Sequence, residues 1–342
     1  MSIVCALEDF CPPESGCAVA LGFFDGVHKG HQRILSRVVQ LAAQAADGVP
    51  LQPVAYTFIN HPAQTVHPQS RIELLSTPEE RWQRISDFGL QAVAEPFDAV
   101  LANWEPQEFW QRKIVENLRA KAVVCGANYS FGRGASGTPP MLLAWGQAAG
   151  IQVEIVSMAE YGGEPISSSR LRQAVRLGRM REVTDMLGCP FAVTGVVERG
   201  NCLGRRWGFP TANIPWPAAK MLPPLGAYAC IAELPDGRKL PAVGYLGSRP
   251  TLREANSGVR LEVNIGSWQS GRPYWRQDCY EDDSGGEYNL YGKLLVVRFM
   301  EFLAPQECFA GLEQLRERIH LYRQLAKSEL ATLGDVCKSA IS

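Results

Sequence analysis

The 342-residue chain lacks the features that mark several functional classes. Its 34 Lys and Arg and 35 Asp and Glu leave a formal net charge of -1, so electrostatics gives no reason to expect a nucleic-acid partner, and any phosphate site must be local. No apolar run reaches membrane-spanning length, which argues against a membrane protein. The first ten residues carry Glu8 and Asp9 and no basic start, so we expect no signal peptide.

The ten cysteines are scattered along the chain. No two of them have the CxxC spacing, and they do not cluster as in a disulfide-rich protein. We therefore expect free thiols in a reducing cytoplasm rather than disulfides or zinc. Internal repeats and low-complexity segments are absent as well. With 46% apolar and 20% charged residues over this length, the chain reads as an ordinary globular protein of roughly two domains. Nothing in the composition fixes the oligomeric state, and a homo-oligomer is compatible with it.

The predicted secondary structure changes at Gly188-Cys189-Pro190, which we interpret as a hinge. Before this hinge, strand-like and helix-like runs alternate, which predicts a parallel, doubly wound α/β sheet. The expected strands are residues 17–21, 51–59, 92–96, 122–126 and 151–156, and the expected helices include 32–46, 77–88 and 106–118. After the hinge, short β-rich runs broken by Gly and Pro predict an antiparallel barrel or sandwich, followed by one long helix that starts at Pro305.

The most informative stretch is residues 22–31, GFFDGVHKGH, between the first of these strands and the helix that follows. Its three glycines let the backbone turn sharply and approach a bound group, while the new helix directs unsatisfied N–H groups at that group. This geometry predicts an anion site. His28 and His31 add imidazoles that can hold phosphate oxygens, and Asp25 is the expected turn former.

Two further segments of the first half fit the same sheet edge. Ser167, Ser168 and Ser169 cap a helix that carries Arg170 and Arg172, which predicts a second phosphate-binding helix start. Residues 126–137, GANYSFGRGASG, follow a buried strand and offer aromatic rings and an amide for a flat heterocycle. By itself each segment is also compatible with a purely structural cap or loop.

In the second half, residues 195–213 form a glycine-rich stretch that ends in GFPTAN. Such glycines allow a loop over phosphates, and the oxygens of Thr211 and Asn213 suit a hard cation such as Mg²⁺.

Taken in order, GFFDGVHKGH, the 126–137 loop, ISSSRLR and GFPTAN resemble the motifs of prokaryotic bifunctional riboflavin kinase/FMN adenylyltransferases, and HKGH is the HxGH signature of nucleotidylyltransferases. The resemblance implies a Rossmann-like FMN adenylyltransferase domain with a parallel sheet at 1–188. It implies an antiparallel β-barrel riboflavin kinase domain with a terminal helix at 189–328, and a C-terminal tail at 329–342. The implied reactions are ATP-dependent phosphorylation of riboflavin to FMN and adenylylation of FMN to FAD with release of pyrophosphate, both with Mg²⁺.

The resemblance also implies site residues. Catalytic roles fall on His28, His31 and Arg172 for adenylyl transfer, and on Glu262 as the base of the kinase. ATP contacts are expected at Gly22, Phe23, Asp25, Gly26, Gly30, Ser168, Ser169, Gly204, Gly208, Thr211 and Asn213. Metal contacts are expected at Thr211 and Asn213, and flavin contacts at His61, Asn128, Tyr129, Phe131 and Arg249.

The sequence departs from the family pattern mainly in its second half. Ala304 lies in a segment where the family usually has an Arg, Tyr322 stands where it tends to have Asp, and residues 269–288 look like an insertion. These departures concern riboflavin binding more than ATP binding. They leave open a paralogue that retains only adenylylation, on a modified flavin and with a degenerate kinase module. A flavin- or nucleotide-sensing binding protein on the same fold is the non-enzymatic alternative.

Overall fold

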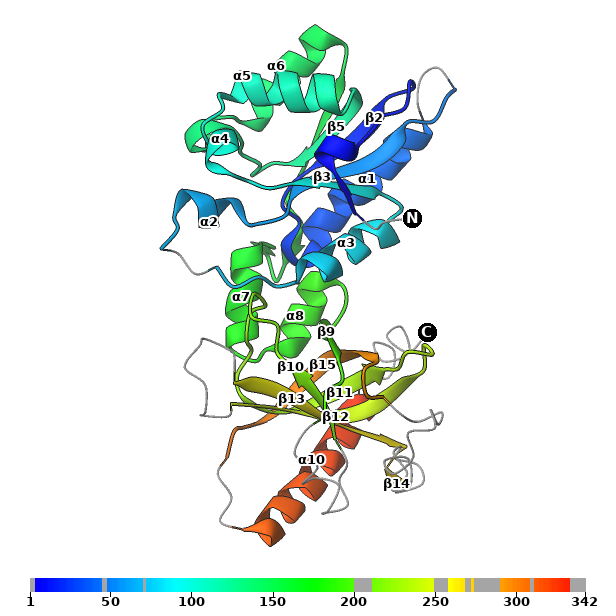
Figure 1. The fold of residues 1–342 in the computed structure, drawn as a ribbon, viewed down its shortest axis with the longest axis vertical. Helices are drawn as coiled ribbons and strands as arrows, with labels where there is room; N and C mark the ends of the chain where they lie inside the picture. Colours follow the sequence, from blue (N-terminus) through cyan, green and yellow to red (C-terminus); the bar gives the residue numbers. More distant parts are fainter. Residues whose placement is uncertain are drawn as a thin grey trace. The chain divides into compact units, whose positions relative to one another are not determined.

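A computed structural model describes residues 4–44, 48–69, 72–199, 211–248, 258–267, 272–273, 290–307 and 311–332. The chain forms two compact units, Met1–Ser168 and Ser169–Ser342 (Figure 1). Among the described residues, no helix combines the length and the apolar character needed to cross a membrane.

The first unit is built on one parallel sheet of six strands in the order β1-β4-β3-β2-β5-β6. This order confirms the predicted doubly wound sheet. The strands are β1 (Val4–Ala6), β2 (Cys17–Leu21), β3 (Gln52–Phe58), β4 (Gln91–Glu95), β5 (Ala120–Gly126) and β6 (Gln152–Val156). A separate two-stranded ribbon consists of β7 (Glu160–Tyr161) and β8 (Glu164–Pro165).

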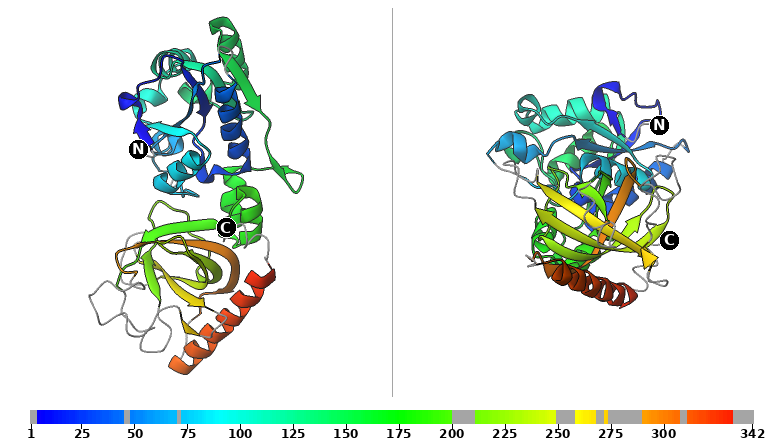
Figure 2. Two further views of the ribbon diagram at one scale, coloured as in Figure 1. Left: turned by 90° about the vertical axis from the view of Figure 1, so that its right-hand side faces the viewer. Right: turned by 60° about the horizontal axis from the view of Figure 1, so that its bottom comes forward.

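Helices cover both faces of this sheet (Figures 1 and 2). The helices of this unit are η1 (Leu7–Asp9), η2 (Asp25–Val27), α1 (Lys29–Ala43), α2 (Pro62–Val66), α3 (Pro78–Asp87), α4 (Ala99–Ala102), α5 (Pro106–Phe109), the π-helix η3 (Trp110–Asn117), η4 (Arg133–Ala135) and α6 (Pro139–Ala149). Because side chains alternate along a strand, Cys17 and Val19 of β2 face a core with η3 and α6, whereas Ala18 and Ala20 face a core with α1 and α3.

Two helices of the first unit show how local sequence sets their ends. A capping box opens α3, in which the Thr77 hydroxyl accepts from the Glu80 N–H and the Glu80 carboxylate accepts from the Thr77 N–H. The helix predicted over 106–118 is instead split into α5 and a π-helix, whose inner side buries Trp110, Lys113 and Ile114.

The second unit begins with two helices and continues into an antiparallel sheet of order β10-β13-β12-β11-β15-β9. A bridge between Glu198, just after β9, and Asn213 of β10 joins the two ends of this sheet, so it forms a barrel, as the fold prediction expected. The elements are α7 (Ser168–Arg176), α8 (Met180–Leu187), β9 (Phe191–Val196), β10 (Ala212–Pro215), β11 (Gly226–Glu233), β12 (Lys239–Ser248), β13 (Val259–Ser267), β14 (Arg272–Pro273), β15 (Leu294–Pro305) and α10 (Leu312–Thr332).

The long helix α10 packs on the barrel through an apolar cluster that includes Ala229, Met300, Tyr322 and Ala326. Its predicted start at Pro305 is wrong. Strand β15 runs through Pro305, which pairs with Gly226, and the helix begins at Leu312. A proline without an N–H can end a strand as well as open a helix, so the residue type alone did not distinguish the two outcomes.

Candidate active sites

The turn between β2 and α1 has a strained backbone. Phe24, Gly26 and Val27 have positive φ angles of 59°, 75° and 44°. Glycine adopts such angles readily, whereas a β-branched residue does so only when its surroundings impose them, at a cost of about 1–3 kcal/mol. A Cβ at Gly30 would lie 3.1 Å from the His28 ring, so a larger residue there would press on that ring. The turn is therefore a specific, enforced conformation.

Hydrogen bonds from a distant segment hold this turn in place. The buried Asp25 carboxylate accepts from the backbone N–H groups of Leu75 (2.9 Å) and Ser76 (3.2 Å). The Ser76 hydroxyl accepts from the Gly26 N–H at 3.1 Å, and the Gln32 side chain donates to the Val27 carbonyl at 2.8 Å. Asp25 thus ties the turn to the residues before α3, in addition to its expected place in the turn itself.

The two histidines of the motif lie against each other at the start of α1. Their rings are stacked, with centroids 3.7 Å apart and planes 18° from parallel. His28 is the N-cap, and its Nδ1 accepts from the His31 N–H at 3.4 Å. Burial lowers the pKa of His28 to about 4, against the opposing effect of Asp25. Burial and then the neighbouring His28 lower the pKa of His31 well below its usual value. Both imidazoles are therefore neutral at pH 7.

The serine-rich segment contacts the turn within the first unit. The Ser168 hydroxyl donates to the Asp25 carbonyl at 3.4 Å. Ser169 and Arg172 continue along α7 in the second unit, where Arg170 lies 3.9 Å from the Glu182 carboxylate. The ATP contacts of Ser169 and Arg172 remain predictions.

The predicted flavin residues of the first unit occupy two places. His61 caps α2, its Nδ1 accepts from the Ala63 N–H at 3.1 Å, and its ring meets Phe23 of the glycine turn at 4.6 Å. Tyr129 and Phe131 follow β5 and stack at 5.7 Å, but Phe131 is buried in the core. Asn128 is exposed in the same loop. The structure thus brings His61 to the glycine turn, and the flavin roles of all four residues remain predictions.

Sequence reasoning missed a buried polar group at the carboxyl ends of β3 and β4. The Tyr56 hydroxyl donates to the Glu95 carboxylate, and the Lys113 ammonium lies 2.6 Å from the other oxygen of Glu95. Lys113 is buried and also lies over the Trp104 ring. A signal was available, since Glu95 ends a buried strand at the sheet edge where α/β proteins bind ligands.

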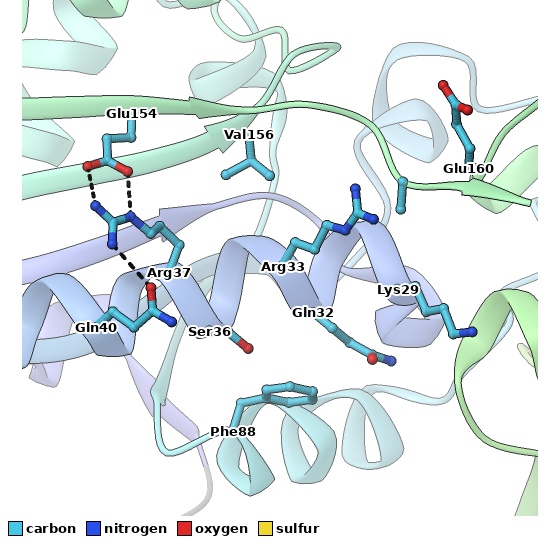
Figure 3. Close-up of a pocket in the computed structure, with 11 residues that line it drawn as sticks. Lys29, Gln32, Arg33, Ser36, Arg37, Gln40, Phe88, Glu154, Val156 and Glu160 are labelled. Atoms are coloured by element: carbon cyan, nitrogen blue, oxygen red, sulfur yellow. Dashed lines mark hydrogen bonds and ion pairs between the residues drawn. The ribbon is translucent and has the colours of Figure 1, made fainter.

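A pocket of 570 Å³ lies along the solvent side of α1 (Figure 3). It is lined by Lys29, Gln32, Arg33, Ser36, Arg37, Gln40, Phe88, Glu154, Val156, Ala159 and Glu160. Arg37 is neutralised by Glu154 through two hydrogen bonds, of 2.6 and 2.8 Å. Lys29 and Arg33, one turn apart, form no ion pair with any residue that the structure describes. Their charge adds to the positive potential at the histidine end of α1.

In the barrel, Asn213 of β10 and Glu262 of β13 face each other as register partners. Such partners have Cβ atoms about 4.5–5.5 Å apart. Asn213 is buried, and its Oδ1 accepts no hydrogen bond from the described part of the chain. Thr211 precedes β10, and its carbonyl accepts from the Asn213 amide at 3.3 Å. Gly204, Gly208 and Arg249, as well as nearly all of the suspected insertion, lie outside the described residues.

Two of the departures from the family pattern, Ala304 and Tyr322, lie in the same part of the second unit. Ala304 of β15 pairs with Ala227 of β11, and both contact the cluster in which the Tyr322 ring is buried. The Tyr322 hydroxyl has no hydrogen-bond partner among the described residues. Ala304 of the strand and Tyr322 of the helix therefore belong to one apolar cluster.

Comparisons with known proteins match the two parts of the chain to two different families. The family model described as FAD synthetase matches residues 12–170, and the model described as riboflavin kinase matches residues 187–330. A bifunctional riboflavin kinase/FMN adenylyltransferase of Escherichia coli is 30% identical over 90% of both chains. One from Listeria monocytogenes is 27% identical over 93% of both.

A solved structure matches over nearly the full length. It is a crystal structure from Streptococcus pneumoniae titled as a macrolide-efflux protein, with a TM-score of 0.77 and 26% identity, and the match covers 95% of this chain and 99% of that one. With these motifs, two matching family models and full-length relatives, the chain belongs to the bifunctional riboflavin kinase/FMN adenylyltransferase family.

Proposed function

We propose that this chain makes FMN from riboflavin and ATP, and FAD from FMN and ATP, at two separate sites. The single observation that carries the proposal is the enforced turn of residues 22–31, with two stacked, neutral histidines at the start of α1. A turn of this kind serves an anion, and the family membership indicates which anions. No observation favours the paralogue that only adenylylates.

In adenylyl transfer, the FMN phosphate attacks the α-phosphorus of ATP in line, and pyrophosphate leaves. The reaction needs no covalent enzyme intermediate, so the residues act by positioning and by offsetting charge. Neutral His28 and His31 each carry one N–H that can donate to phosphate oxygens, and the helix N-terminus adds backbone donors. Lys29 and Arg33 add positive charge beside them, and Arg172 with Ser168 and Ser169 is assigned to the remaining phosphate oxygens.

In the kinase reaction, Glu262 is assigned as the base that takes the proton from the ribityl hydroxyl as it attacks the γ-phosphorus of ATP and ADP leaves. Mg²⁺ fits the opposite strand, because the buried Asn213 Oδ1 has no donor among the described residues and the Thr211 carbonyl, which accepts from the Asn213 amide, places a second oxygen nearby. Mg²⁺ bound there would neutralise charge on the ATP phosphates. Glu262 and Asn213, as register partners, would then act on the same side of the barrel wall.

We assign the two reactions to different segments of the chain. Adenylylation is assigned to residues 1–188, phosphorylation to 189–328, and 329–342 is taken as a tail. The six cysteines described as free thiols favour a reducing compartment, which supports the cytoplasm as the place of action. Small-molecule substrates account for both sites without a nucleic acid or a membrane.

The test is a chromatographic assay of the purified chain in two parallel reactions, one with riboflavin, ATP and Mg²⁺ and one with FMN in place of riboflavin. We expect FMN and FAD in the first and FAD in the second. FAD in the second reaction alone would refute the kinase activity and would favour the alternative, a paralogue that only adenylylates. Absence of FAD from both would refute the adenylyltransferase.

A further inference from the structure

Arg81, on the inner side of α3, has the largest fully buried side chain among the residues that the structure describes. Its Nη2 donates to the carbonyls of Phe58 (2.7 Å) and Ile59 (3.3 Å), at the end of β3. Its guanidinium carbon lies 4.1 Å above the Phe23 ring, just after β2. One side chain therefore contacts the carboxyl ends of two neighbouring strands.

Arg81 is connected to the glycine turn both directly, through Phe23, and through strand β3. Phe23 is the second residue of the GFFDGVHKGH motif, and the Thr57 hydroxyl of β3 donates to its carbonyl at 3.1 Å. On its other side, the Phe23 ring meets His61 at 4.6 Å. Arg81 thus fixes the position of the Phe23 ring between the end of β3 and His61.

This arrangement is costly for stability. The Nε and Nη1 atoms of Arg81 are buried and donate no hydrogen bond within the described part of the chain, where Arg81 also forms no ion pair. Burial lowers its pKa to about 10, while Asp25 and Glu79 act in the opposite sense. A well-packed apolar residue would generally serve a core at lower cost than an incompletely paired cation. Buried polar groups without partners call for a functional explanation.

We propose that Arg81 is a positioning residue for adenylyl transfer, which holds Phe23 against the end of β3 so that the turn presents His28 and His31 in their reactive geometry. This inference rests on the proposed adenylyltransferase function. A planar guanidinium can lie on an aromatic ring and donate in its own plane at the same time. An ammonium has the same charge but not this geometry, so Lys should not replace Arg81.

The experiment compares Arg81→Lys and Arg81→Gln with Thr77→Ala, which removes the cap of the same helix and keeps the backbone hydrogen bond from the Arg81 N–H to the Thr77 carbonyl. FAD formation from FMN and ATP is measured at a temperature well below the unfolding midpoint of every variant. FMN formation from riboflavin in the same preparations serves as the internal control. We expect both Arg81 variants to lose kcat for FAD formation by roughly 10- to 100-fold, with KM for ATP and FMN changed less than threefold. Thr77→Ala should lower the unfolding temperature and keep kcat within twofold.

Arg81→Lys is the decisive variant, because it keeps the positive charge and changes only the geometry. Arg81→Gln also removes the charge and is at greater risk of misfolding. Wild-type kcat in Arg81→Lys, or a loss in Thr77→Ala as large as that in Arg81→Lys, would overturn the positioning role. Either result would leave the proposed function standing, because that function fails only if the wild-type chain itself forms no FAD.

Discussion

The imidazole rings of His28 and His31 are stacked 3.7 Å apart at the start of α1. Two imidazolium cations at this separation would repel each other strongly, and burial already disfavours the charged form of both. Both rings are therefore neutral at pH 7, and in the proposed reaction they would donate hydrogen bonds beside a helix N-terminus. This state has consequences for stability as well as for catalysis.

The depressed pKa values predict a loss of stability in mild acid. An unfolded His binds its proton near pH 6.5, whereas folded His28 binds it only near pH 4. Between these values the unfolded state holds more protons, so the free energy of unfolding falls as the pH falls. For His28 alone, the loss from pH 7 to pH 5 is about 2 kcal/mol. We expect His28→Asn to remove this part of the slope in urea unfolding.

The control for this prediction is His67→Asn, since His67 is exposed at the end of α2. This variant should keep the wild-type dependence on pH. Parallel pH profiles for wild type and His28→Asn would contradict the neutral, buried state of His28.

The free oxygen of Asn213 predicts a metal effect confined to one reaction. Asn213→Ala should raise the Mg²⁺ concentration that gives half-maximal FMN formation by roughly tenfold or more, because an oxygen ligand is lost. Asn213→Asp keeps the oxygen and should keep the requirement near wild type. Titration of Mg²⁺ in both reactions measures the effect, and FAD formation from FMN should not respond. An unchanged Mg²⁺ requirement in Asn213→Ala would remove the metal role of this residue.

The buried hydroxyl of Tyr322 predicts that a smaller side chain is tolerated. Since this hydroxyl has no partner among the described residues, Tyr322→Phe should leave the unfolding free energy unchanged or raise it by up to about 1 kcal/mol. Tyr322→Asp, which restores the usual family residue, places a carboxylate in the apolar cluster and should destabilise the barrel by several kcal/mol. Thermal unfolding of both variants checks this. A clear loss of stability in Tyr322→Phe would show that the hydroxyl has a partner.

The sequence allowed the sheet of the first unit to be predicted because β2 and β5 are buried runs and each is followed by a clear turn or helix signal. His28 and His31 could be placed together because three residues span one helical turn. The positive φ of Val27 could not be predicted, since it depends on Asp25 and Ser76, which are 51 positions apart. Arg81 could not be identified either, because one Arg on an amphipathic helix normally faces solvent.

The central claim is that two separate sites on one chain catalyse consecutive reactions, and two substitutions measured in both reactions test it most directly. His28→Ala should reduce FAD formation from FMN by at least about a hundredfold, because it removes a donor to the reacting phosphates, and leave FMN formation within twofold. Glu262→Gln should reduce FMN formation by a comparable factor, because it removes the base, and leave FAD formation within twofold. This crossed pattern is the predicted result. A substitution that lowers both reactions equally, at a pH and temperature where the protein is folded, would contradict the two-site account.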